Sequence, residues 1–247
     1  MREDRLLTSD ALFGGKLLVC QEQKGYRFSL DAVLLAGLTR IGKNDRVIEL
    51  GTGCGVIPLI LAYRAETEQR IAAVEIQPEL ADLAKKNVAD NRMEDKIEIH
   101  ALDFRKSGPF FEPESFDLVL SNPPYRKPGA GRISPESQKA LARHELTADV
   151  FDVFGAARRL VPTGGRVAVI YPATRLANLF RAAHERGFTP KRLTLIHSYP
   201  QGPGRLVHLE CLKGGGEELR VEPPFTIYDG PNRYSHAMQE LYEERHQ

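Results

Sequence analysis

The motif Asn122-Pro123-Pro124-Tyr125 follows the apolar run at residues 116–121 and could position a nucleophilic nitrogen. Two prolines fix φ and remove two amide donors, so the carbonyls of this segment project rigidly. The side-chain oxygen of Asn122 and the carbonyl of Pro123 would accept both hydrogens of one exocyclic amino group and turn its lone pair outward. Tyr125 would stack on the attached ring, a contact worth roughly 1–3 kcal/mol. A rigid proline turn without chemistry is the alternative.

A glycine-rich segment, Glu49-Leu50-Gly51-Thr52-Gly53-Cys54-Gly55, lies upstream at the end of another apolar run. Its glycines would let the backbone turn sharply and approach a ligand closely. The amides at the start of the next helix favour an anion, and the G-x-G-x-G spacing differs from the dinucleotide fingerprint. Together with an amino-group site, the segment predicts S-adenosylmethionine (SAM), although a plain strand-to-helix turn is the alternative. The expected cofactor contacts here are Glu49, Gly51, Thr52, Gly53 and Gly55.

Two acidic residues follow later predicted strands. Glu75 comes about 20 residues after the glycines, where an acid commonly accepts hydrogen bonds from a ribose. A solvated carboxylate at a strand end is the alternative. Asp103 would accept a hydrogen bond from the adenine amino group of SAM, with Phe104 beside the ring, or would instead cap a turn. Ile76 completes this group of expected cofactor contacts.

Residues 25–32 lead into a predicted helix, for which Ser29 is a suitable N-cap. Capping does not exclude a second role in closing over the cofactor. The further cofactor contacts expected from this segment are Arg27, Ser29, Asp31 and Ala32.

Basic residues follow the proline motif directly, at Arg126, Lys127 and Arg132. This segment would grip phosphates around a base flipped out of its stack. An exposed loop with ordinary solvated charges is the alternative.

These residues need a scaffold, and apolar runs alternate with helix-like segments from about residue 45 onward. The predicted strands are 46–50, 71–75, 97–102, 116–121 and 166–171, with two more near 193–197 and 206–212. Such alternation indicates right-handed βαβ units and a mostly parallel sheet, whose ligands bind beyond the carboxyl ends of the strands. The residues at or just after predicted strand ends are Glu49, Glu75, Asp103 and Asn122. We therefore predict an α/β, Rossmann-like fold with a seven-stranded sheet and helices on both faces.

The chain is expected to contain one main domain. Residues 1–44 form an N-terminal extension, with a short hairpin around Gly14-Gly15 and a helix from Ser29. Residues 45–213 form the SAM-dependent methyltransferase domain, and residues 214–247 form a C-terminal segment that packs on the same domain.

Composition limits the partners. A net charge of +1 excludes a global basic field, so any RNA contact must be local. The three cysteines and the histidines lack disulfide or metal-ligand spacing, so we expect no metal. We find no signal peptide and no apolar stretch of roughly 18 residues, so no membrane partner and a cytoplasmic location are expected. The oligomeric state is left open.

These motifs together resemble one family, the bacterial tRNA(Val) adenine-N6 methyltransferases. The resemblance rests on residues 28–36, on the glycine segment and on Ser121-Asn122-Pro123-Pro124-Tyr125, and extends to Arg143-His144-Glu145 and Gly230-Pro231-Asn232-Arg233-Tyr234-Ser235. It runs through about residues 15–243, whereas the segment 126–135 varies among relatives.

The resemblance implies a class I SAM-dependent methyltransferase fold and methylation of an adenine N6 in one tRNA, at the nucleotide 3′ to the anticodon. Asn122, Pro123, Pro124 and Tyr125 would then hold the target base, and Tyr125, Arg126, Lys127 and Arg132 would contact the RNA. SAM would bind at the glycine segment, Glu75 and Asp103.

Three other functions compete with this interpretation. Methyltransferases that modify a glutamine N5 in release factors share the Asn-Pro-Pro-Tyr motif but carry a longer N-terminal helical domain. Enzymes that methylate guanine N2 in ribosomal RNA more often have Phe after the prolines, so Tyr125 argues mildly against them. An idle SAM- or nucleotide-binding module is the fourth possibility, and the intact glycine loop argues against it.

Overall fold

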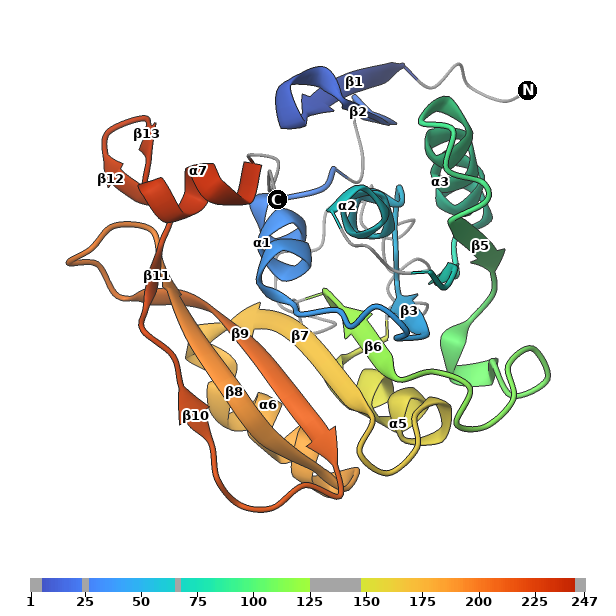
Figure 1. The fold of residues 1–247 in the computed structure, drawn as a ribbon, viewed down its shortest axis with the longest axis vertical. Helices are drawn as coiled ribbons and strands as arrows, with labels where there is room; N and C mark the ends of the chain where they lie inside the picture. Colours follow the sequence, from blue (N-terminus) through green and yellow to red (C-terminus); the bar gives the residue numbers. More distant parts are fainter. Residues whose placement is uncertain (1–5, 24–26, 65–67, 125–147, 243–247) are drawn as a thin grey trace, which may run out of the picture.

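The computed structural model of this chain describes residues 6–23, 27–64, 68–124 and 148–242. Within these residues one large sheet runs in the order β10-β8-β9-β7-β6-β3-β4-β5, and β11 also pairs with β8 (Figure 1). Its main strands are β3 (Val47–Leu50), β4 (Ile71–Glu75), β5 (Ile97–Ala101), β6 (Leu118–Ser121), β7 (Arg166–Pro172), β8 (Phe188–His197) and β9 (Gly204–Lys213). This confirms the predicted Rossmann-like fold with a mostly parallel sheet, and these seven strands are the predicted ones in a sheet of nine described strands.

The strand order reverses beside β3. β4 and β5 lie on one side of it, β6 and β7 lie on the other, and these neighbours pair in parallel. β9 runs antiparallel to both β7 and β8. In open α/β sheets, ligands bind at the carboxyl ends of the strands where the order reverses. The topology therefore directs a ligand to the ends of β3 and β6.

Helices cover both faces of the sheet, as Figure 1 shows. One face packs on α1 (Leu30–Leu38), α2 (Val56–Arg64) and α3 (Pro78–Asp90), and the other packs on α5 (Val150–Leu160) and α6 (Leu176–Glu185). Short 3-10 helices follow β1, β5 and β7 at Phe13–Gly15, Phe104–Lys106 and Ala173–Arg175.

The sequence explains α5 particularly well. Val150, Val153, Phe154 and Ala157 recur at helical spacing, and all four are buried. A capping box between Asp149 and Asp152 fixes the first turn.

The C-terminal segment extends the sheet, which the strand pattern did not predict. β10 (Arg220–Val221) and β11 (Phe225–Thr226) pair in parallel with successive parts of β8. The hairpin of β12 (Tyr228–Gly230) and β13 (Arg233–Tyr234) follows, and then α7 (His236–Tyr242), which contacts α1. Two-residue strands are too short to show the alternation by which a strand is recognised.

An N-terminal hairpin of β1 (Leu7–Leu12) and β2 (Leu17–Glu22) docks on α3 through two asparagines. Asn87 accepts a hydrogen bond from the backbone N–H of Cys20 at 2.8 Å and donates to its carbonyl at 2.8 Å. One helical turn later, Asn91 makes the same pair of bonds to Leu18. The helix thus presents the donors and acceptors that a neighbouring strand would present to β2.

Asn87→Ala should destabilise the protein more than Asn91→Ala. Asn87 is fully buried and also donates to the carbonyl of Cys54, so its removal leaves three backbone groups without this partner. An unsatisfied buried polar group costs about 1–3 kcal/mol, and water can reach the partly buried Cys20, so we expect a loss of about 2–4 kcal/mol. Urea denaturation of both variants measures the difference. Equal losses in the free energy of unfolding would contradict the larger role assigned to the hydrogen bonds of Asn87.

Candidate functional site

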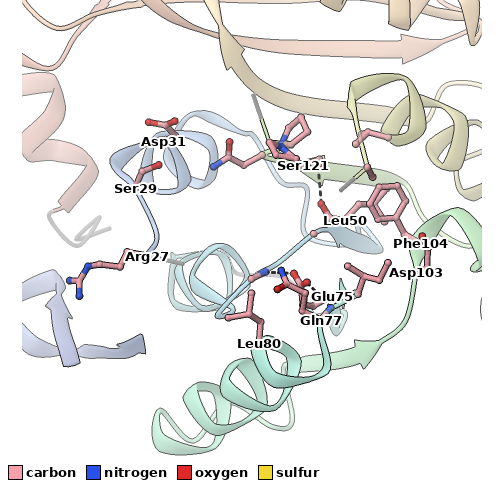
Figure 2. A pocket seen from close by; sticks show the side chains of 18 residues that line it. Arg27, Ser29, Asp31, Leu50, Glu75, Gln77, Leu80, Asp103, Phe104 and Ser121 are labelled. Atoms are coloured by element: carbon pink, nitrogen blue, oxygen red, sulfur yellow. Dashed lines mark hydrogen bonds between the residues drawn. The ribbon is translucent and has the colours of Figure 1, made fainter. Parts of the chain in front are cut away.

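A cavity of about 320 Å³ lies at the carboxyl edge of the sheet (Figure 2). It opens where β3 and β6 end, as the strand order requires. The residues lining it are Arg27, Ser29, Asp31, Leu50, Gly51, Gly53, Glu75, Ile76, Gln77, Leu80, Asp103, Phe104, Ser121, Asn122, Pro123, Pro124, Ala148 and Val153. Most of the cofactor contacts expected from the sequence are thus brought to one place. Among the described residues, the expected contacts Ala32, Glu49, Thr52 and Gly55 lie outside this lining.

The glycine segment forms a tight loop over the end of β4. Gly51, Gly53 and Gly55 have φ of 83°, 59° and 84°, values that side chains rarely adopt. At Gly55 an added Cβ would also lie 3.1 Å from the Cβ of Ala84 in α3. The glycines therefore serve both the turn and the close packing of α3 against it.

Glu75 anchors this loop. Its carboxylate accepts a hydrogen bond from the backbone N–H of Gly53 on one oxygen and from that of Gln77 on the other, each at 2.9 Å. Burial raises the pKa of the Glu75 carboxyl. The residue lines the cavity, where a carboxylate can accept hydrogen bonds from a ligand diol.

Glu49 lies behind the loop. Its carboxyl is 1% exposed and accepts a hydrogen bond from Thr52 Oγ1 at 2.5 Å. Burial raises its pKa to about 8, opposed by the Thr52 hydroxyl and reinforced by the charge of Glu75. Glu49 is therefore mainly protonated at neutral pH and braces the loop.

Asp103 caps the 3-10 helix Phe104–Lys106, which was the alternative to a contact with the cofactor. Its side chain accepts from the backbone N–H of Arg105 and forms an ion pair with that guanidinium, with a shortest distance of 2.8 Å. The Arg105 side chain lowers the pKa of Asp103, which stays ionised. Phe104 is buried beside it and lines the cavity. A contact between Asp103 and an adenine amino group stays a prediction, and it would have to share the carboxylate with Arg105.

The proline motif begins where β6 ends. Ser121 Oγ donates to the carbonyl of Leu50 at 2.8 Å, which ties the ends of β6 and β3 together, and Asn122, Pro123 and Pro124 line the cavity next to this link. The predicted positions Tyr125, Arg126, Lys127 and Arg132 lie outside the described residues.

The N-terminal hairpin positions the segment before α1. Arg27 bonds to Thr8 Oγ1 at 2.8 Å and to Asp10 at 3.1 Å, and the N–H of Phe28 donates to Gln21 at 3.0 Å. Ser29 occupies the N-cap position of α1, but its side chain makes no capping hydrogen bond. The expected capping bond is therefore wrong, and the hydroxyl lines the cavity instead.

Sequence reasoning missed several lining residues. Gln77 and Leu80 come from the start of α3, Ala148 and Val153 come from around the start of α5, and Leu50 and Ser121 are the last residues of their strands. The first four lie at or near the first turns of α3 and α5, the crossover helices that begin at the carboxyl edge. Gln77 follows Ile76, an expected cofactor contact, and this proximity was the available signal for it.

Within the described part of the chain, no group of three or more His, Cys, Asp or Glu side chains is placed to hold a metal ion. The described helices also include none with the length and apolarity needed to cross a membrane.

Comparison with known proteins identifies several relatives. The methyltransferase small domain model matches residues 29–171. A tRNA1(Val) (adenine(37)-N6)-methyltransferase of Histophilus somni is 31% identical over 87% of this chain and 88% of its own length. The Porphyromonas gingivalis protein of the same name is 34% identical over 73% of this chain and 72% of its own length.

Solved structures share the fold. A predicted O-methyltransferase, Atu636 of Agrobacterium tumefaciens, has a TM-score of 0.70 at 23% identity and covers 86% of this chain and 95% of its own. P. horikoshii TYW2 in complex with MeSAdo has a TM-score of 0.56 at 15% identity and covers 85% of this chain and 72% of its own.

Glu49 should make stability depend on pH. An unfolded glutamate loses its proton at about pH 4.3, whereas the folded pKa is about 8. Between these values the folded state binds the extra proton, so the free energy of unfolding falls as the pH rises from about 5 to about 8. Glu49→Gln keeps an acceptor for Thr52 but cannot titrate. The free energy of unfolding of this variant should therefore fall less between about pH 5 and about pH 8. Denaturation at a series of pH values measures it, and parallel curves for the two proteins would contradict the assignment.

Proposed function

Since the chain belongs to the methyltransferase small domain family and, within it, to the tRNA1(Val) (adenine(37)-N6)-methyltransferases, we propose that it transfers a methyl group from SAM to the N6 amino group of an adenine in tRNA near the anticodon. The observation that carries the proposal is the shared cavity of Glu75 and Asn122. One is suited to a ribose and the other to an amino group, and both lie at the reversal of strand order. A tRNA substrate also supports a cytoplasmic location.

The residues present fit SAM. The carboxylate of Glu75 lines the cavity and has the acceptor oxygens that two ribose hydroxyls need. The glycine loop brings bare backbone to the cavity at Gly51 and Gly53, where a side chain would be strained. Phe104 offers an apolar ring surface in the same wall. When bound, SAM would supply an electrophilic methyl group on its sulfonium.

The protein's part in the reaction is placement of the nucleophile. Asn122 Oδ1 and the carbonyl of Pro123 accept the two amino hydrogens of adenine and hold the nitrogen lone pair out of conjugation with the ring. The nitrogen attacks first and releases its proton afterwards, so no strongly basic side chain is required. Tyr125 stacks on the base, while Arg126, Lys127 and Arg132 contact RNA phosphates. Catalysis then rests on orientation and electrostatics.

The reaction itself is tested with labelled SAM. Purified protein is incubated with total tRNA and, separately, with a glutamine-bearing release factor, and the tRNA is digested to nucleosides. We expect label in N6-methyladenosine. Label in the release factor would instead identify a glutamine methyltransferase, and unlabelled tRNA would overturn the proposal.

Asn122→Ala should separate chemistry from cofactor binding. The variant loses one acceptor that orients the amino group, and the loss of one such preorganised polar contact typically costs about 10²–10³-fold in kcat. Its SAM affinity, measured by calorimetry, should change little. Asn44→Ala, at an exposed position before β3 and therefore at the opposite edge of the sheet, is the matched control and should retain both quantities. Equal losses of SAM affinity and rate in Asn122→Ala would reject the assigned role.

A further inference from the structure

A continuous series of aromatic ring contacts crosses the C-terminal segment. Tyr199 contacts Tyr228 at 5.6 Å between ring centroids, Tyr228 stacks on Tyr234 at 5.2 Å, and Tyr234 stacks on Tyr242 at 5.7 Å. The two stacked pairs are nearly parallel, with interplanar angles of 15° and 22°. The series continues inward from Tyr242 to Phe13. Packing of the β12–β13 hairpin and α7 explains its inner rings, but not its outer end.

Tyr199 is that outer end, and it is 46% exposed. Among the described residues its one ring contact is with Tyr228, and close to half of its surface is open to solvent. An open aromatic face at the end of a stack is a surface on which a further flat ring can pack.

The turn that carries Tyr199 is held rigidly. The N–H of Gly202 donates to the carbonyl of Tyr199 at 3.0 Å, and the His197 ring bonds to the carbonyl of Gly202 at 2.7 Å. From outside the turn, the N–H of Tyr228 donates to the carbonyl of Ser198 at 2.9 Å. Pro200 and Pro203 restrict the remaining backbone. The backbone that carries the Tyr199 ring is therefore already ordered, so binding a partner there would cost little further conformational entropy.

The register of the sheet puts this turn at the same edge as the cavity. β6 ends at Ser121, which pairs with Val169 of β7, and β7 ends at Pro172, which pairs with Leu206 of β9. His197, at the end of β8, pairs with Gly204 at the start of β9. The turn between β8 and β9 thus follows the carboxyl ends of β6 and β7 along one edge.

The charge of the turn suits a polyanion. Residues 198–205 contain no Asp or Glu and end on the exposed Arg205. Exposed aromatic rings and basic residues on one surface are what proteins use to stack unpaired bases and hold the adjoining phosphates. An apolar protein partner would gain nothing from the cation.

We propose that Tyr199 is the open position of this aromatic stack and takes an unpaired nucleobase of the RNA substrate, distinct from the adenine that is methylated. The proposal rests on the proposed function. The base adds a further layer beyond Tyr199, while Arg205 attracts the phosphate backbone.

Tyr199→Trp tests the stacking directly. The chain contains no Trp, so the new indole is the sole tryptophan fluorophore, and it retains a flat ring. Titration with total tRNA or with an anticodon stem-loop transcript should quench its emission with saturation. Phe110→Trp, at an aromatic position that is 64% exposed after the 3-10 helix that follows β5, is the matched control and should keep its emission. Saturable RNA binding without any change in the Tyr199→Trp emission would overturn the proposal.

Tyr199→Ala measures the contribution of the ring. Loss of one stacked base should raise the KM for tRNA roughly five- to 150-fold, with kcat and SAM affinity retained. Tyr199→Phe should keep the KM of the unaltered protein, because stacking needs the ring and not the hydroxyl. Unchanged thermal unfolding of Tyr199→Ala would show that the fold is intact.

Different results would overturn the stacking role of Tyr199 and the proposed function. An unchanged KM for Tyr199→Ala, in a protein that forms N6-methyladenosine in tRNA, would overturn the stacking role and leave the proposed function standing. Absence of methylated tRNA with the unaltered protein would overturn the proposed function itself. Quenching by tRNA in that case would still support a nucleobase at Tyr199.

Discussion

The cavity depends on one buried carboxylate. Glu75 ends β4 and holds the N–H of Gly53 in the preceding loop and the N–H of Gln77 before α3. Without it, two backbone donors at the cavity wall would lose their partners, and the loop would remain tied to β4 through the N–H groups of Gly51 and Thr52, which donate to the carbonyl of Val74. Burial of this group is costly, as its raised pKa indicates, and the two backbone hydrogen bonds offset part of that cost. Its carboxylate also lines the cavity, where it can accept hydrogen bonds from a ligand.

A second constraint joins segments far apart in the chain. Asn87 and Asn91 attach the N-terminal hairpin to α3, whose first turn follows Glu75. The hairpin in turn holds Arg27 through Asp10. The wall proposed to bind SAM is therefore built by α3, the glycine loop and the hairpin as one hydrogen-bonded unit, although these segments are separated in the sequence.

Much of this could be predicted from sequence, and the failures have physical causes. Alternating apolar runs predicted the sheet, and its carboxyl edge predicted where Glu75 and Asn122 meet. Glu49 was expected to reach the ligand, but the register pairs it with Ala73, two residues before Glu75. At about 3.3 Å per residue, Glu49 lies a full pleat deeper along the same face, beneath the loop. Sequence shows that both acids end strands, but only the register shows which of them reaches the cavity. Asp103 was ambiguous for a different reason, since a carboxylate two residues before an arginine can serve either the backbone or a ligand.

The two sides of the cavity are held by different means, which bears on how the protein separates binding from chemistry. The Glu75 side is fixed by a network that includes α3 and the hairpin. The Asn122 side is fixed to β3 by the hydrogen bond from Ser121 Oγ to the carbonyl of Leu50. This bond lies where β6 ends and the proline motif begins. Prolines lack the N–H needed for a ladder, so β6 cannot continue through Pro123 and Pro124. In the proposed reaction the carbonyl of Pro123 then serves as an acceptor for the amino nucleophile. The feature that ends the strand would therefore also supply part of the chemistry.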